Sequence, residues 1–112
     1  QGTGMRAEVL ERLMTPGVMP RLRALHLDWN KVRAPGAKLL AKRPESSELR
    51  TLDLRRNVIL DEGAFALAAS SYLGNLEVLW LDWNGIGPEG RAAIEGAPWF
   101  EGVRQVRWAH NG

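Results

Sequence analysis

The fold of this chain is decided by four strings, LRALHLDWN (residues 22–30), LRTLDLRRN (49–57), LEVLWLDWN (76–84) and VRQVRWAHN (103–111). Each string ends in Asn, and the Asn residues recur at a spacing of 27 residues, three times without a slip. A fixed period of this length indicates that copies of one structural unit stack on each other, so that several copies together build any functional surface.

The second half of each string predicts a short strand. Leu25 and Leu27 alternate with other residues, as do Leu52 and Leu54 one period later, and a period of two is typical of a half-buried strand. We expect parallel strands near 24–27, 51–54, 78–81 and 105–108. The Asn follows where the chain must turn, and its amide can donate and accept hydrogen bonds to backbone groups left unpaired there.

The stretch after each Asn predicts a helix. In the second copy Gly63 is followed by Ala64, Leu67 and Ala68, a spacing that puts the apolar residues on one helix face. We expect helices near 35–42, 62–70 and 89–96, and an incomplete leading copy with a helix near 6–14. Residues 43–48 depart from the pattern, because Ser46 stands where Leu73 stands one period later, and they predict a looser, polar loop.

These strings, with the I/V-x(3)-G-A-x(2)-L-A pattern that follows them, resemble leucine-rich repeats of the ribonuclease-inhibitor-like class over roughly residues 7–111. The resemblance implies an α/β solenoid, with parallel strands on a concave face and helices on a convex face. It also implies a module that binds proteins or peptides through the concave face, and it implies no catalysis by the repeats.

Length and composition indicate a single domain and argue against nucleic-acid-binding, disulfide-bonded and membrane-spanning proteins. Residues 5–112 suit a single leucine-rich-repeat domain with a leading helix, three full repeats and a terminal strand, while Gln1–Gly4 before Met5 looks like a vector-derived leader. A net charge of +2 is too small to predict nucleic-acid binding. The absence of Cys excludes disulfides and thiolate chemistry, and no apolar run approaches the ~20 residues of a membrane span.

Twelve of the fifteen basic residues are Arg, a bias typical of GC-rich genomes. Together with the lack of Cys, this bias favours a bacterial, cytoplasmic protein, and no motif in the sequence predicts a cofactor.

Residues in equivalent positions of successive strands should lie ~4.8 Å apart on the concave face. The four columns are Trp29, Arg56, Trp83 and His110; Asp28, Arg55, Asp82 and Ala109; His26, Asp53, Trp80 and Arg107; and Ala24, Thr51, Val78 and Gln105. None of the three Trp residues occupies a leucine position, so the core does not require them there.

Trp and Arg are the residues most enriched at binding hot spots. Arg56 can stack between Trp29 and Trp83 for ~0.5–2 kcal/mol, and Asp28 and Asp82 can orient Arg55. We therefore predict a partner-binding surface made of Trp29, Arg56, Trp83, Trp80, His26, Asp28, Arg55, Asp53, Asp82, Arg107 and His110. The alternative is that the stack only stabilises the strand face.

Other readings of the sequence are weaker. His26 and Asp53 superficially resemble a catalytic dyad, but no nucleophile joins them, and with Asp28 they form a poor metal-ligand set. Trp99, Phe100 and Trp108 are expected in the core or packed at the end of the stack. A different class of function is structural: the chain is an assembly unit or a fragment of a longer array, and copies join through open strand edges, above all the strand 103–108.

Overall fold

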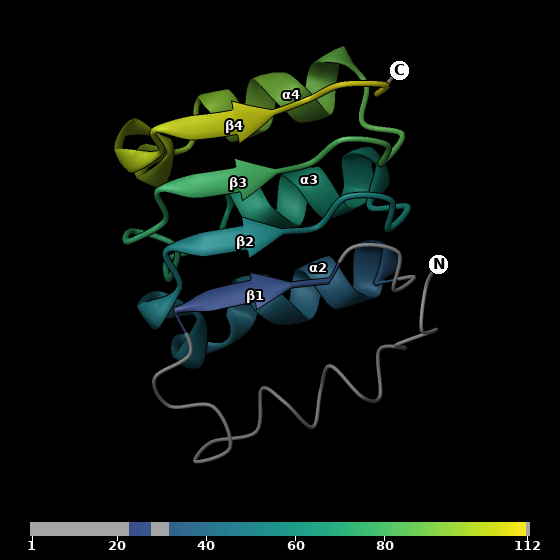
Figure 1. Cartoon of the computed structure of the whole chain (residues 1–112). Helices are drawn as coiled ribbons and strands as arrows, with labels where there is room; N and C mark the ends of the chain where they lie inside the picture. The colour runs from purple at the N-terminus through teal and green to yellow at the C-terminus, as the bar shows by residue number, and fades with distance from the viewer. Residues whose placement is uncertain (1–22, 28–31, 112) are drawn as a thin grey trace.

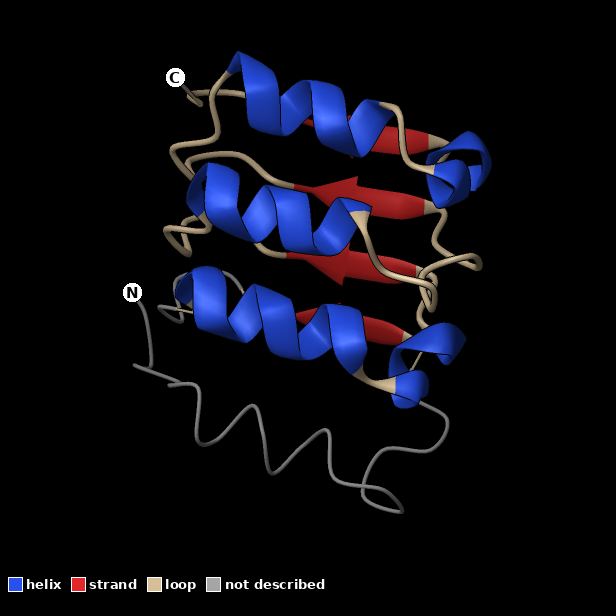
Figure 2. Cartoon of the chain, turned by 180° about the vertical axis from the view of Figure 1, so that it is seen from behind, coloured by secondary structure: helices blue, strands red, loops and turns tan. Residues whose placement is uncertain are grey.

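The computed structural model describes residues 23–27 and 32–111. Its elements follow in the order β1 (Ala24–His26), α2 (Arg33–Lys42), η1 (Pro44–Glu48), β2 (Thr51–Asp53), α3 (Leu60–Ala68), β3 (Val78–Trp80), α4 (Pro88–Glu95), η2 (Pro98–Gly102) and β4 (Gln105–Arg107), where η marks a 3₁₀-helix. The strands form one layer and the α-helices cover one side of it, as Figures 1 and 2 show from opposite directions.

The four strands form one parallel sheet in the order β1-β2-β3-β4. Partners in adjacent strands are 27 residues apart, so that Leu25, Leu52, Leu79 and Val106 lie side by side across the sheet. The predicted parallel strands are confirmed, although each ends one residue earlier than expected. The three predicted helices within the described residues are also confirmed, and each begins one or two residues earlier. The leading helix expected near 6–14 lies outside the described residues.

The core fills the space between the strands and the helices. Leu52 and Leu79 from the sheet and Leu40, Leu67 and Ile94 from the helices are all 0 % exposed. The helices approach closely, because small residues stand at their contacts. A Cβ placed on Gly63 would overlap the Ile59 side chain and lie 3.2 Å from Ala37 Cβ, so this position in the stack requires glycine.

A ladder of the side chains of Asn57, Asn84 and Asn111 closes the turns after β2, β3 and β4, as the sequence predicts. Asn84 Oδ1 accepts hydrogen bonds from the backbone N–H groups of Asn57 at 2.9 Å and Ile59 at 3.2 Å, in the preceding repeat. Its Nδ2 donates to the Leu54 carbonyl at 2.7 Å and to the Leu81 carbonyl at 3.0 Å. Asn111 makes the equivalent bonds one period later. Each Asn therefore joins two repeats through backbone groups that would otherwise be buried without partners.

The expectation of a loose loop at residues 43–48 is wrong. Residues 44–48 form η1, which begins at Pro44, and Ser46 is 0 % exposed. Its hydroxyl donates to the Leu40 carbonyl at 2.7 Å, and its own carbonyl accepts from Leu49 N–H at 3.0 Å. A serine can replace leucine at this buried position because its only polar side-chain group is fully paired.

The aromatic residues expected in the core at the far end of the stack are found there. Trp99 is buried, and its Nε1 donates to the Leu67 carbonyl at 3.1 Å. Phe100 and Trp108 are half-buried and pack against the core. The Arg91 guanidinium lies 5.0 Å from the Trp108 ring centroid, so the last helix covers part of this ring.

Candidate partner-binding surface

We call the side of the sheet that the α-helices leave uncovered the strand face (Figures 1 and 2). The register places His26, Asp53, Trp80 and Arg107 in one row across it, as the column analysis predicts. His26 Nδ1 lies 3.4 Å from Asp53 Oδ2, and the His26 ring is tilted against the Trp80 ring at a centroid distance of 6.4 Å. His26 therefore contacts its neighbour in the adjacent strand β2 and also approaches a ring in β3.

Arg55 is held by Asp53, two residues before it in the same repeat. Its Nε and Nη2 donate to the two Asp53 carboxylate oxygens at 2.9 and 2.8 Å, and the Arg55 backbone N–H donates to Oδ1 at 3.2 Å. The guanidinium lies 5.0 Å from the centroid of the Trp80 ring. This two-point geometry fixes the plane of the guanidinium. The sequence did not single out Asp53 as the partner of Arg55.

The pKa of Asp53 reflects this environment. Burial of the carboxyl group raises its pKa, but hydrogen bonds from the Arg55 side chain and backbone and from His26 lower it by more. The net result is a pKa below the ordinary value, so Asp53 is ionised in the folded protein at neutral pH.

The contribution of Asp53 to the stability of the fold should therefore change as the solution is acidified. The carboxylate stabilises the folded state at pH values above the unfolded pKa of about 3.9, and this contribution is lost as pH falls through the lower folded pKa. Denaturant melts between pH 7 and pH 2 should show Asp53→Asn less stable than wild type at pH 7, with the difference shrinking below about pH 4. A difference that stays constant to pH 2 would show that the charge of Asp53 does not stabilise the fold.

Two guanidinium groups lie near the Trp80 ring. Besides Arg55, the Arg107 guanidinium lies 5.9 Å from the Trp80 ring centroid, and Arg107 Nε lies 3.4 Å from Asp82 Oδ2. Asp82, which the sequence places next to Arg55, thus forms an ion pair with Arg107 of the following repeat. Asp82 Oδ1 and Trp80 Nε1 are buried and have no hydrogen-bond partner in the structure.

Trp83 and His110 lie in the turns that follow β3 and β4, at the rim of the strand face. Their rings stack at a centroid distance of 4.2 Å and an interplanar angle of 19°. Both residues adopt φ of +62°, and Arg56, one period before Trp83, has φ of +59°. This left-handed conformation is uncommon for residues other than glycine, and the repeated turn imposes it on this column.

Half of the Trp83 surface is exposed, so its stacking on His110 does not bury it. Trp29 and Asp28 lie outside the described residues. The predicted stack of Arg56 between Trp29 and Trp83, and the contact of Asp28 with Arg55, therefore stay predictions.

Charge on the described part of the strand face is layered. The side chains of Asp53 and Asp82 are only 2 % and 6 % exposed, whereas those of His26 and Arg107 are 56 % and 54 % exposed. The two carboxylates lie at the base of the surface, and the basic and aromatic groups lie above them. A partner that approaches this part of the face meets Trp83, His110, Arg107 and His26 before it meets either carboxylate.

The sequence profile of a family described as Leucine Rich repeat matches residues 19–41, 46–68 and 75–94, which is more than half of the chain. The chain belongs to the leucine-rich repeat family. A comparison with curated proteins gives no match. Leucine-rich repeats generally mediate protein–protein binding, and the family typically consists of binding modules without enzymatic activity.

Within residues 23–27 and 32–111, these leucine-rich repeats bring no group of three or more His, Asp or Glu residues together in metal-binding proximity. Of the serines, Ser46 donates to the Leu40 carbonyl within its own repeat, and Ser70 donates to the Ala41 carbonyl of the preceding repeat, so both hydroxyls have structural roles. No helix in this part of the chain is both long and apolar enough to cross a membrane. On the strand face, aromatic and basic side chains lie together, among them His26, Trp80 and Arg107.

Proposed function

We propose that these leucine-rich repeats bind a protein or peptide partner through the strand face, without catalysis. The observation that carries the proposal is the exposed Trp83 ring, stacked on His110 at 4.2 Å and 50 % exposed. Large exposed aromatic rings next to basic groups are typical of binding hot spots, and Trp83 fills no space in the core. The proposed surface keeps the full predicted set, including Trp29 and Asp28.

The strand face is suited to binding because its side chains are held in place. Arg55 is held by two side-chain hydrogen bonds that it donates to Asp53, and the guanidinium groups of Arg55 and Arg107 lie 5.0 and 5.9 Å from the Trp80 ring centroid. Side chains that are ordered before a partner arrives lose little conformational entropy on binding, an advantage of about 0.5–1.5 kcal/mol for each rotamer-rich side chain.

Because the basic side chains are exposed and the carboxylates are covered, the strand face is suited to a partner segment that is acidic. Arg107 and His26 are more than half exposed, while the nearby carboxylates of Asp53 and Asp82 are covered. Complementary charge raises the association rate and selects among partners. The net charge of +2 supports a protein rather than a nucleic acid, because it provides no broad positive field for a phosphate backbone.

Truncation of Trp83 should weaken binding strongly. We expect Trp83→Ala to lose at least about 2 kcal/mol of binding free energy to a confirmed partner, roughly 30-fold in affinity, as is typical of a hot-spot Trp. Isothermal titration calorimetry measures this loss. Phe65→Ala is the matched control, because Phe65 is a 44 % exposed aromatic residue on α3, in the helix layer. Circular dichroism should be unchanged in both variants. A Trp29→Ala/Trp83→Ala protein that binds as tightly as wild type would refute the assignment of this face.

A second candidate function is assembly of copies through β4. Within the described residues β4 pairs with β3 alone, so its outer edge presents backbone groups that can pair with another strand. We expect light scattering to show a mass that rises with concentration. A monomer at every concentration, together with blue-shifted emission from Trp108, would exclude this candidate. In that case Arg91, which lies over the Trp108 ring, would be the residue that covers this end of the stack.

A further inference from the structure

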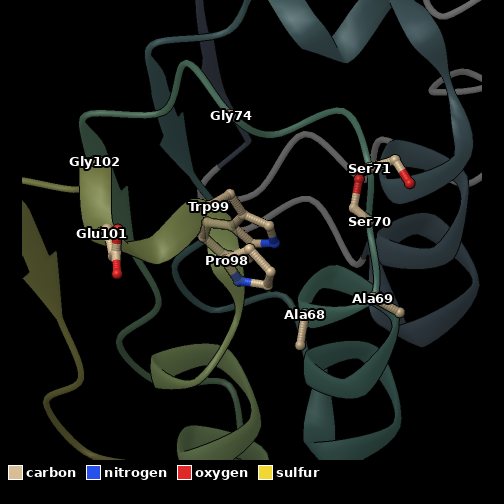
Figure 3. Close-up of a pocket in the computed structure, with 9 residues that line it drawn as sticks. All are labelled: Ala68, Ala69, Ser70, Ser71, Gly74, Pro98, Trp99, Glu101 and Gly102. Carbon is tan, nitrogen blue, oxygen red and sulfur yellow. The ribbon is translucent and has the colours of Figure 1, made fainter.

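A hollow of about 690 Å³ lies between the last turn of α3 and η2. In Figure 3, Pro98 and Trp99 lie between Glu101 on one side and Ser70 on the other, and Ala68 and Ala69 mark the end of α3. None of the predicted partner-binding residues of the strand face lines it.

The hollow exists because the middle repeat departs from its neighbours. In the flanking repeats Pro44 and Pro98 each start a 3₁₀-helix, since the proline ring presets the φ angle that such a turn needs. The equivalent residue in the middle repeat is Ser71, and residues 71–75 form no helix. A Cβ placed on Gly74 would meet no atom within 4 Å, so this segment leaves space unfilled.

The lining of the hollow includes one carboxylate and no positively charged side chain. Glu101 contributes a carboxylate, and neither Lys nor Arg is among the lining residues. The last turn of α3 has no basic residue, and its Leu67 carbonyl already accepts hydrogen bonds from Ser70 N–H and Trp99 Nε1, both at 3.1 Å. The Ser70 hydroxyl is already engaged, because it donates to the Ala41 carbonyl and accepts from Tyr72 N–H.

We propose that this hollow binds the cationic side chain of an Arg or Lys residue in a partner segment. The aliphatic stem of such a side chain packs on Pro98, Trp99 and the Ala residues at the end of α3, while its charged head reaches the Glu101 carboxylate. An anionic group would meet the Glu101 carboxylate without any compensating cation among the lining residues. The site is independent of the proposed function of the strand face.

The test uses the whole chain labelled with ¹⁵N and titrated with N-acetyl-arginine amide. Two reporters lie at the hollow, the Trp99 indole N–H and the backbone N–H of Gly102. N-acetyl-citrulline amide is the matched probe, because it has nearly the shape of the arginine compound without its charge. Glu101→Gln is the matched variant, because Glu101 is exposed and its change leaves the core intact.

We expect saturable shifts of both reporters with the arginine amide. Affinity should fall about two- to fivefold with the citrulline amide, and by a similar factor for the arginine amide in Glu101→Gln, as suits a solvent-exposed ion pair. Trp83→Ala should leave the affinity unchanged. Equal binding of both amides, an undiminished affinity in Glu101→Gln, or no shift of either reporter would overturn the proposal and leave the strand-face function untouched.

Discussion

Replacing Leu54 by alanine should lower the free energy of unfolding by about 2–5 kcal/mol. Leu54 is 0 % exposed and follows β2 in the middle of the stack, with its backbone N–H bonded to the Trp80 carbonyl at 2.9 Å. Loss of its side chain removes apolar contacts and leaves a cavity that repeats on both sides cannot fill without moving. Denaturant melts of the purified protein measure the change.

Leu60→Ala is the matched control for this change. Leu60 is 45 % exposed, and we expect its substitution to change stability by no more than about 0.5 kcal/mol. If Leu54→Ala were as mild as the control, the leucine column after β2 would not be part of the core, and the stacking of the repeats as described would be wrong.

The second large effect concerns the Asn ladder. Asn84→Ala should cost about 1–3 kcal/mol, because it removes the acceptor of the Asn57 and Ile59 backbone N–H groups and the donor to the Leu54 carbonyl. All of these groups are in the buried turn between two repeats, where water cannot replace the lost partner. We expect Asn57→Ala to have a similar cost, because Asn57 accepts from Val32 N–H at 3.0 Å and donates to the Leu27 carbonyl at 2.7 Å.

Asn75→Ala is the matched control, because it removes an Asn side chain that is not part of the ladder. Asn75 is exposed and its Nδ2 donates to one backbone carbonyl, that of Ser47, at 2.7 Å. Its substitution should change stability by about 0.5 kcal/mol or less. Equal costs for Asn75→Ala and Asn84→Ala would mean that the ladder contributes nothing specific to the joining of repeats.

The repeat period made most of the fold predictable. A spacing of 27 residues held without a slip determines which residues of β1 to β4 lie side by side, and the alternation of Leu52 and Leu54 determines which face is buried. The contact of His26 with Asp53 followed from this register alone. The role of the Asn residues also followed, because an amide at a fixed turn can pair with backbone groups of the neighbouring repeat.

Side-chain pairing on the strand face was only partly predictable. A column of equivalent positions shows which residues are neighbours in adjacent strands. It gives no information on contacts within one repeat, such as the two hydrogen bonds that the Arg55 side chain donates to the Asp53 carboxylate. It also could not show that the turn imposes a positive φ on Trp83 and His110 and so brings their rings face to face. Ser46 was misjudged because polarity was read as exposure, while its hydroxyl is paired with a backbone carbonyl in the core.

The central claim is that the strand face is the partner-binding surface, and hydrogen–deuterium exchange of the complex tests it most directly. The partner for this measurement is a protein that wild type retains in a pull-down and the Trp29→Ala/Trp83→Ala protein does not. We predict that the partner slows exchange in residues 78–84 and 105–110, which hold β3, β4 and their turns, and leaves α3 unchanged. Slowed exchange confined to α2, α3 and α4 would contradict the account.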